Sequence, residues 1–315
     1  MRTPGIIALL ASSFVLGGCN GGDTQTTGGG TTGTPGDTAN ALTIHTGEFE
    51  VPAGDSFECF YTDTITDREL SAVSSTAKQG PGGHHVIIYY TDTPLEAQHH
   101  TCSNAEMASW HQVSGAGNGT SGAEGLIQLP PGLAVKVAAG KQIVVQTHYI
   151  NTTGASEKVN DSITLNLVDA KDVKEYANYY VVNDDQFEVP PQGKLTSQRT
   201  CTVDSDLDLV MMVGHMHEAG RHFTLERADK DGQPFTPVYD HEWKAEYASH
   251  PPALNYTMEK PLHFAKGTKL RQTCSWDNST SDPLLFPNEM CVSFMYYFPD
   301  IGERICPMDP APPAP

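Results

Sequence analysis

Residues 83–90 read Gly-His-His-Val-Ile-Ile-Tyr-Tyr, a β-branched and aromatic run that opens on two histidines. Short apolar runs of this kind are typical of strands, and clusters of Gly, Pro, Asn and Asp separate them along the chain. Seven such runs lie at 86–90, 142–149, 162–168, 176–182, 207–213, 222–225 and 292–298. Since no long segment shows a helical period, the sequence predicts an all-β protein built from β-sandwiches.

A weak internal repeat indicates that there are two sandwiches. Phe49-Glu50-Val51-Pro52 recurs as Phe187-Glu188-Val189-Pro190, and a cysteine and then a histidine pair follow each copy. A single core stops growing near 250–300 residues, so 315 residues also favour two domains. We therefore expect tandem domains at 41–185 and 186–308, followed by a Pro-rich tail at 309–315.

The N-terminus is typical of a lipoprotein leader. A basic residue and an apolar run precede Leu16-Gly17-Gly18-Cys19, which reads as a lipobox. We expect residues 1–18 to be a signal peptide, Cys19 to be acylated, and the Gly/Thr-rich residues 19–40 to be a tether. The alternative is an ordinary signal peptide followed by a chance cysteine. The prediction places the protein in a bacterial cell envelope, lipid-anchored, in the outer membrane or facing the periplasm.

The charge balance limits the partners. There are 38 acidic and 19 basic residues, a net charge of −19, and no basic stripe. This composition argues against a nucleic-acid partner and against an anionic membrane surface as the main ligand. Beyond the N-terminus, no apolar run approaches the roughly 20 residues that a spanning helix needs.

Six cysteines remain besides Cys19, and none lies in a CxxC pair. An even number in an exported protein predicts three disulfides, but six cysteines allow 15 pairings and spacing alone does not choose among them. They are Cys59, Cys102, Cys201, Cys274, Cys291 and Cys306.

The placement of the histidines indicates metal binding in the first half. His148 lies within an expected strand, and His84 and His85 open another. Adjacent residues point to opposite faces of a regular strand, so this pair needs an irregular backbone to share a metal. Gly82-Gly83, just before the pair, would allow one.

The second half offers a comparable set. His215 and His217 are two residues apart at the end of a strand, so their side chains point the same way. Met290, next to a cysteine, is a candidate third ligand, and a thioether with imidazoles favours Cu(I). From spacing alone the metal is copper or zinc. The other histidines, including His99-His100, are expected to be ordinary hydrogen-bonded residues.

The order of these motifs over residues 42–308 resembles the ascorbate-dependent type II copper monooxygenases, the family of peptidylglycine α-hydroxylating monooxygenase and dopamine β-hydroxylase. The motifs are Gly83-His84-His85, Gln146-x-His148, His215-x-His217, and Glu289-Met290-Cys291 with a trailing Tyr296-Tyr297. The resemblance implies two tandem antiparallel, jelly-roll-like sandwiches with one copper each, two ions per chain. It also implies the pairings Cys59–Cys102, Cys201–Cys306 and Cys274–Cys291.

The resemblance assigns roles to the same residues. His84, His85 and His148 would hold an electron-transfer copper, and His215, His217 and Met290 an oxygen-binding copper. Gln146 matches a family glutamine beside the first site and joins His215, His217 and Met290 among the expected catalytic residues. The implied reaction is hydroxylation of a C–H bond with O2 and a reductant such as ascorbate, one copper passing an electron to the other across an interdomain cleft.

Three departures from the peptide-modifying enzyme bear on the substrate. Its Arg, Asn and Tyr anchors for a carboxylate correspond here to Val213, Val292 and Phe294. A buried carboxylate without partners costs several kcal/mol, so we expect a small neutral or apolar substrate. The alternatives are a non-catalytic copper-binding lipoprotein for storage, delivery or sensing, and an adhesion or scaffold sandwich.

Overall fold

The computed structural model describes residues 40–103, 106, 109–117, 127–248 and 250–309. The predicted signal peptide, Cys19, the tether up to residue 39 and the tail from residue 310 lie outside the described residues. Most of the described residues lie in strands, with short 3₁₀ helices at Ala170–Asp172 and Ala245–Ala248, so the predicted all-β class is confirmed. Within the described part, no helix is long and apolar enough to cross a membrane.

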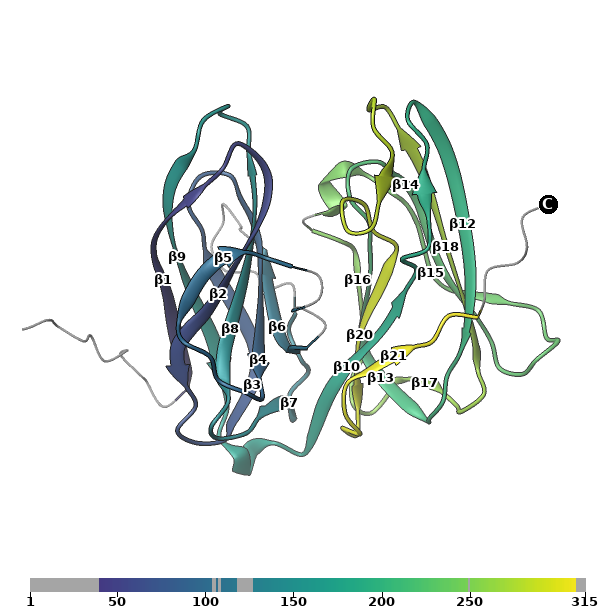
Figure 1. Ribbon diagram of the computed structural model, residues 1–315. Helices are drawn as coiled ribbons and strands as arrows, with labels where there is room; N and C mark the ends of the chain where they lie inside the picture. Colours follow the sequence, from purple (N-terminus) through teal and green to yellow (C-terminus); the bar gives the residue numbers. More distant parts are fainter. Residues whose placement is uncertain (1–39, 104–105, 107–108, 118–126, 249, 310–315) are drawn as a thin grey trace, which may run out of the picture. The chain divides into compact units, whose positions relative to one another are not determined.

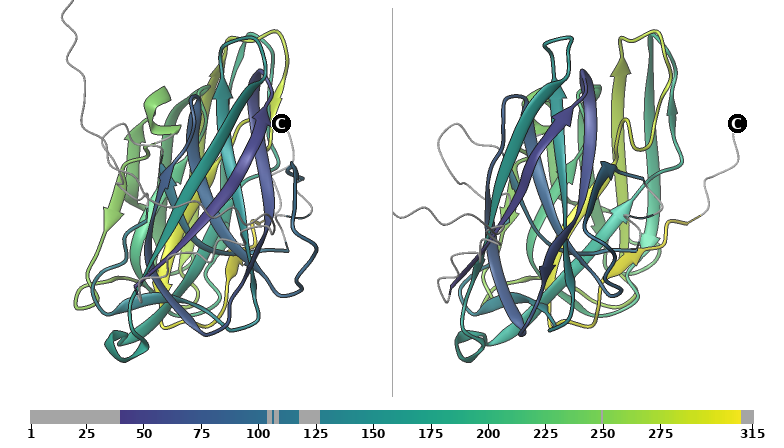
Figure 2. Two further views of the ribbon diagram at one scale, coloured as in Figure 1. Left: turned by 90° about the vertical axis from the view of Figure 1, so that its left-hand side faces the viewer. Right: turned by 60° about the vertical axis from the view of Figure 1, so that its left-hand side comes forward.

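The first half forms two layers around one core (Figure 1, Figure 2). One layer has the order β5 (Gln98–Thr101), β2 (Gly54–Ile65), β8 (Gln142–Asn151), β4 (Gly83–Thr91) and β6 (His111–Gly117). The other has the order β1 (Ala41–Val51), β9 (Glu157–Leu167), β3 (Leu70–Lys78) and β7 (Leu133–Val137). Buried side chains such as Val86, Ile88, Ile163 and Leu165 belong to the core between them.

The second half repeats this layered plan. Its four-stranded sheet has the order β12 (Gly193–Thr202), β18 (Lys269–Asn278), β14 (Gly220–Ala228) and β15 (Thr236–Glu242). The other layer contains β10 (Glu175–Asn183), β20 (Val292–Phe298), β13 (Leu207–His215), β16 (Ala253–Asn255), β17 (Leu262–Phe264) and β21 (Arg304–Cys306). A small pair, β11 (Glu188–Val189) and β19 (Leu284–Leu285), completes it. Met212, Phe223, Leu225 and Met295 lie in this second core.

One sheet continues from the first half into the second. β7 pairs with β10 in parallel, and β10 also pairs in parallel with β21, so these two pairs depart from the expected antiparallel pattern. Tyr179, Met211 and Tyr296 of the second half pack into the core cluster of the first. The domain boundary at residue 185 stays a prediction; β10, which precedes it, pairs along most of its length with β20.

The internal repeat has a structural counterpart. The side-chain amide of Asn151 donates to the carbonyls of Val51 and Pro52, and that of Asn278 donates to those of Val189 and Pro190. In each case the same amide also donates to the carbonyl four residues further on, at Ala155 and at Asp282. Both copies of the Phe-Glu-Val-Pro motif are therefore tied down by an equivalent asparagine.

Three disulfides join the pairs that the resemblance implied: Cys59–Cys102, Cys201–Cys306 and Cys274–Cys291. The first links β2 to the segment after β5, and the second joins β12 to β21. The third ties β18 to the residue that follows Met290, so it holds the approach to β20 against the four-stranded sheet.

Candidate metal centre

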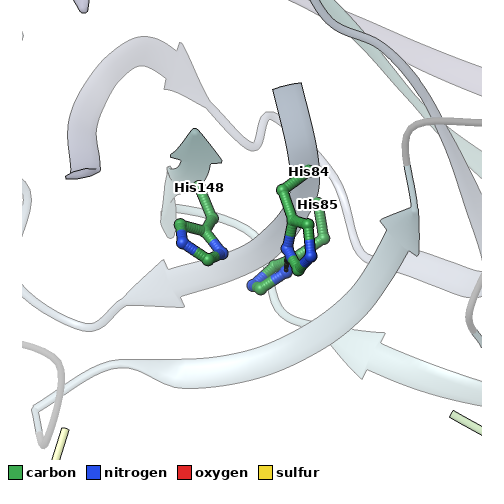
Figure 3. Close-up of side chains that lie close together, drawn as sticks. All are labelled: His84, His85 and His148. Atoms are coloured by element: carbon green, nitrogen blue, oxygen red, sulfur yellow. Dashed lines mark hydrogen bonds between the residues drawn. The ribbon is translucent and has the colours of Figure 1, made fainter. Parts of the chain in front are cut away.

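An irregularity in β4 brings His84 and His85 together with His148. Gly83 lies opposite Tyr149 and His85 opposite His148, so the β4–β8 pairing has one extra residue, His84. Such a bulge turns two successive side chains to one side of a strand. The expected irregular backbone is therefore present. Figure 3 shows the side chains of His84, His85 and His148 close together.

Gly82 contributes to this geometry. It has a φ of +79°, a region that favours glycine, and a Cβ there would come within 3.0 Å of the Ile150 carbonyl oxygen. A residue with a side chain at this position would meet backbone, so the turn into β4 depends on glycine.

The three imidazoles form a metal-binding geometry. One ring nitrogen of each lies within 4.8 Å of those of the other two. The Nδ1 atoms of His84 and His85 are 3.0 Å apart. His148 donates from Nε2 to a carboxylate oxygen of Asp55 at 2.5 Å, and its buried Nδ1 has no hydrogen-bond partner among the described residues. A carboxylate on one nitrogen, with the other left available, is the usual arrangement of a metal-binding histidine.

The surroundings of His84 and His85 keep these two rings neutral. Burial, reinforced by His148 and His217, lowers the pKa of His84 to about 3. Burial also holds the pKa of His85 well below its usual range. Partial burial works against ionisation of Asp55, but its hydrogen bond with His148 lowers its pKa overall. Neutral imidazoles beside one ionised carboxylate suit a soft or borderline metal ion.

The second set lies at the end of β13. The rings of His215 and His217 are 5.1 Å apart between centroids, and both line one cavity with Met290. His217 donates from Nδ1 to the carbonyl of Asn288 at 3.0 Å, which leaves Nε2 buried without a partner among the described residues. Burial, with His217 nearby, holds the pKa of His215 well below its usual range. Two imidazoles and a thioether are a donor set that fits copper.

Glu289 ties this second set together, and the sequence did not reveal that role. Its carboxylate accepts the backbone N–H groups of His217 at 2.5 Å, Ala219 at 3.1 Å and Met290 at 2.9 Å. The residue is 1% exposed, and burial raises its pKa. It therefore couples the segment after β13 to the segment before β20. Its position next to Met290 was the only available signal.

The two sets are neighbours. The rings of His85 and His215 are 6.4 Å apart between centroids, and those of His148 and His217 are 6.3 Å apart. The resemblance implied one copper per sandwich with a cleft between them. Here the two sets lie against each other, and His85, His215, His217 and Met290 line one cavity.

That cavity has a volume of about 840 Å³ and mostly apolar walls. Val213 and Phe294, at two of the three positions of the missing carboxylate anchors, line it, while Val292 is buried beside it. Gln146 also lines it and is 5% exposed, with its amide nitrogen 3.8 Å from Cys102 Sγ. Of the described residues that line the cavity, none is Lys or Arg.

Other histidines make ordinary pairs, as expected. His99 contacts Glu58 at 2.9 Å, and His100 contacts Glu106 at 2.6 Å. Among the described residues, only His84, His85 and His148 form a cluster of three or more His, Cys, Asp or Glu ligand atoms.

The comparisons agree with the motif order in the second half. Residues 176–313 match the family described as "Copper type II ascorbate-dependent monooxygenase, C-terminal domain". This match contains His215, His217 and Met290 and leaves the first three histidines outside it. No curated protein matches the chain.

Solved structures give only distant matches. A chain of Sulfolobus turreted icosahedral virus has a TM-score of 0.25 at 9% identity, with 83% of this chain and 60% of that chain covered. A chain of infectious bursal disease virus, Gx strain, has a TM-score of 0.21 at 11% identity, with 85% of this chain and 75% of that chain covered. A secreted protein from Parabacteroides distasonis has a TM-score of 0.20 at 8% identity, with 85% of this chain and 86% of that chain covered. The chain thus spans 60% of the first of these chains. TM-scores this low do not establish a shared fold.

Proposed function

Because residues 176–313 match the C-terminal domain of the copper type II ascorbate-dependent monooxygenases, we propose that this chain is a copper-dependent monooxygenase. It hydroxylates a C–H bond of a small neutral or apolar molecule with O2 and an external reductant such as ascorbate. The observation that carries the proposal is the pair of adjacent ligand sets, four of whose six residues line a large, mostly apolar cavity.

His84, His85 and His148 would hold one copper ion, and His215, His217 and Met290 a second. Copper supplies one-electron chemistry and the activation of O2 when it is bound. Asp55 and the Asn288 carbonyl keep a proton on the outer nitrogens of His148 and His217, so each ring presents its other nitrogen. Glu289 and the Cys274–Cys291 bridge hold Met290 beside the two histidines.

The cavity positions the substrate and excludes water. Its apolar walls leave a substrate carboxylate without a cationic partner, which favours a neutral molecule. A second cavity of about 310 Å³ supplies a separate approach to the histidines for a small reductant. It is lined by His84, His148 and His217, by Arg221, and by the acidic residues Asp55, Glu218, Asp277 and Glu289. A protein that only stored copper would not need the large apolar cavity.

Reductant-dependent O2 uptake by the copper-loaded protein tests this function. The enzyme should turn over, and Met290→Ile should abolish turnover while the copper held by three histidines keeps its spectrum. Met308→Ile, a methionine outside the cavity, is the matched control and should behave as wild type. Two equivalents of bound copper with no turnover on any neutral substrate would instead favour storage or delivery.

We also propose that acyl chains on Cys19 anchor the protein in a bacterial envelope, because Leu16-Gly17-Gly18-Cys19 has the lipobox pattern. Mass spectrometry of the mature N-terminus would detect the lipid, and Cys19→Ser should release the protein from the membrane fraction. An unmodified Cys19 in the mature protein would contradict the anchor and leave the enzymatic proposal untouched.

A further inference from the structure

One wall of the apolar cavity is built by alternate residues of β4. Val86 and Ile88 are fully buried in the first core. His85, Ile87 and Tyr89 point to the other face and line the cavity. On the neighbouring strand β6, Gln112 lies opposite Tyr89 and also lines the cavity. This wall therefore begins at a ligand histidine and ends at an amide and a phenol.

The facing wall has the same layout. On β13, His215, Val213 and Met211 line the cavity, while Met212 points into the second core. On β20, Phe294 pairs with Val213 and Tyr296 with Met211, so both aromatic rings lie on the cavity side. This wall also begins at a ligand histidine and ends at a phenol.

The two walls meet at both ends. At one end the His85 and His215 rings are 6.4 Å apart. At the other end the Gln112 side-chain nitrogen donates to the Tyr296 hydroxyl at 3.5 Å. Four residues of strand separate the ends on each wall, which corresponds to about 13 Å at about 3.3 Å per residue.

The two ends differ from the middle in chemistry. Ile87, Val213 and Phe294 make the middle apolar. The far end has the Gln112 amide and the hydroxyls of Tyr89 and Tyr296. The Tyr296 hydroxyl already donates to the Val113 carbonyl at 3.3 Å, so towards a ligand it acts as an acceptor. Behind it, His111 contacts Asp92 at 3.2 Å and Glu303 at 3.3 Å, so two acidic side chains lie close to this end. Such surroundings disfavour an anionic group and accept a neutral hydrogen-bonding one.

We propose that the part of the cavity between these two walls, here called the slot, selects its ligand by length. It takes an elongated, neutral molecule with an apolar body and one terminal hydroxyl, bound by Gln112 and Tyr296. The opposite end of the ligand, about 13 Å away, then lies beside His215 and Met290. The inference rests on the proposed function only for what happens at that second end. Binding and orientation follow from the walls alone.

Calorimetric titration of the metal-free protein with terminal phenylalkanols of increasing chain length tests the slot. Affinity should rise with each methylene and peak where the extended length from hydroxyl to ring edge is about 13 Å. Phenylalkanoic acids of the same length should bind at least about tenfold more weakly, because a carboxylate finds no cation there. Hydrocarbons that lack the hydroxyl measure the apolar body alone.

Tyr296→Phe and Gln112→Leu should each weaken the alcohols by roughly two- to tenfold and leave the matched hydrocarbons unchanged. Tyr297→Phe removes the same hydroxyl from the next residue, which points to the other face of β20, and is the control. A tighter complex with the acids, no length optimum, or equal losses for alcohol and hydrocarbon would overturn the slot.

The proposed function fails separately. Length-dependent alcohol binding without O2 uptake by the copper-loaded protein would contradict the monooxygenase and support the slot. O2 uptake coupled to a short or acidic substrate would contradict the slot and leave the monooxygenase standing.

Discussion

The imidazole ring of His85, on β4, meets that of His215, at the end of β13, edge to face with centroids 6.4 Å apart. The contact joins the first ligand set to the second. His148 and His217 make a second such contact, with ring centroids 6.3 Å apart. The two sets therefore form a single cluster of imidazoles.

This proximity has a spectroscopic consequence. With two equivalents of Cu(II) bound, we expect a paramagnetic resonance spectrum broadened by interaction between the two spins. His215→Ala should give the narrow spectrum of an isolated three-histidine site. The exposed, Asp240-paired His222 provides the control substitution, His222→Ala. A wild-type spectrum equal to the sum of two independent sites would contradict this expectation.

Asp55→Asn tests how His148 is held. The carboxylate accepts the Nε2 proton at 2.5 Å, and an amide would lose the charge and half of the acceptor capacity. We expect copper affinity of the first set to fall by about 10–100-fold in competition titrations, with little change in thermal stability. Asp67→Asn, an exposed acid remote from the cluster, should leave affinity unchanged. Equal affinities in both variants would rule out a role for Asp55.

Glu289→Gln tests the link between His217 and Met290. The amide retains one acceptor oxygen, and its NH2 group faces a backbone N–H, so at least one buried donor loses its partner. A cost of about 1–3 kcal/mol follows, or a melting temperature lower by several degrees. Copper binding should be lost selectively at the second set. Glu188→Gln is the control, since that side chain is exposed; selective loss at the first set would show that Glu289 acts elsewhere.

Much of the fold was visible in the sequence where strands are apolar. Six of the seven predicted runs fall within observed strands, as at β4 and β20, and the run at 162–168 exceeds β9 by one residue. β12 and β18 escaped notice because both contain Ser, Thr, Gln and Arg. β18 alternates buried with half-exposed residues, and the first six residues of β12 are half-exposed or exposed. The parallel β7–β10 pair depends on contacts between distant segments, which no local pattern encodes.

The candidate site, like the fold, could be predicted only in part from the sequence. Histidine spacing and the Gly82-Gly83 pair pointed to the bulge and to the two ligand sets. Asp55 and Glu289 have no local signature, since an isolated acid in a polar stretch looks the same whether it is exposed or holds a histidine. The contact between His85 and His215 depends on how β4 and β13 approach each other, and spacing within either strand says nothing about it.

The metal-free protein should lose stability as the pH falls below neutrality. In the folded state the pKa of His84 is about 3 and those of His85 and His215 lie well below their usual range, against about 6.5 in the unfolded chain. The unfolded state therefore binds more protons below about pH 6.5, so stability rises with pH in this window. His111 contributes to stability with the opposite sign, because its hydrogen bond with Glu303 raises its pKa. The stability that it adds at low pH is lost as the pH rises above 6.5.

Melting temperatures measured in chelator from about pH 7 to 5 check the sign, in a range above the usual carboxyl pKa values. The stability of His84→Gln should fall less steeply with decreasing pH than that of the wild type. The difference in the free energy of unfolding is up to about 1.4 kcal/mol per pH unit. Repeating the series in a second buffer controls for ion binding. Parallel curves for the two proteins would show that His84 does not contribute.

Val213→Arg should reverse the charge preference of the cavity. Val213 lines the cavity beside its strand neighbour Phe294, between His215 and Met211 on β13. A guanidinium there would supply the cation that the described lining lacks. Phenylalkanoic acids should then gain roughly 10–100-fold in affinity, the range of a charge-assisted hydrogen bond, while the neutral alcohols weaken. Val213→Met adds bulk without charge and separates the two effects: it should weaken acids and alcohols alike. If the arginine variant keeps its preference for alcohols and melts as wild type does, then the missing cation is not what excludes carboxylates.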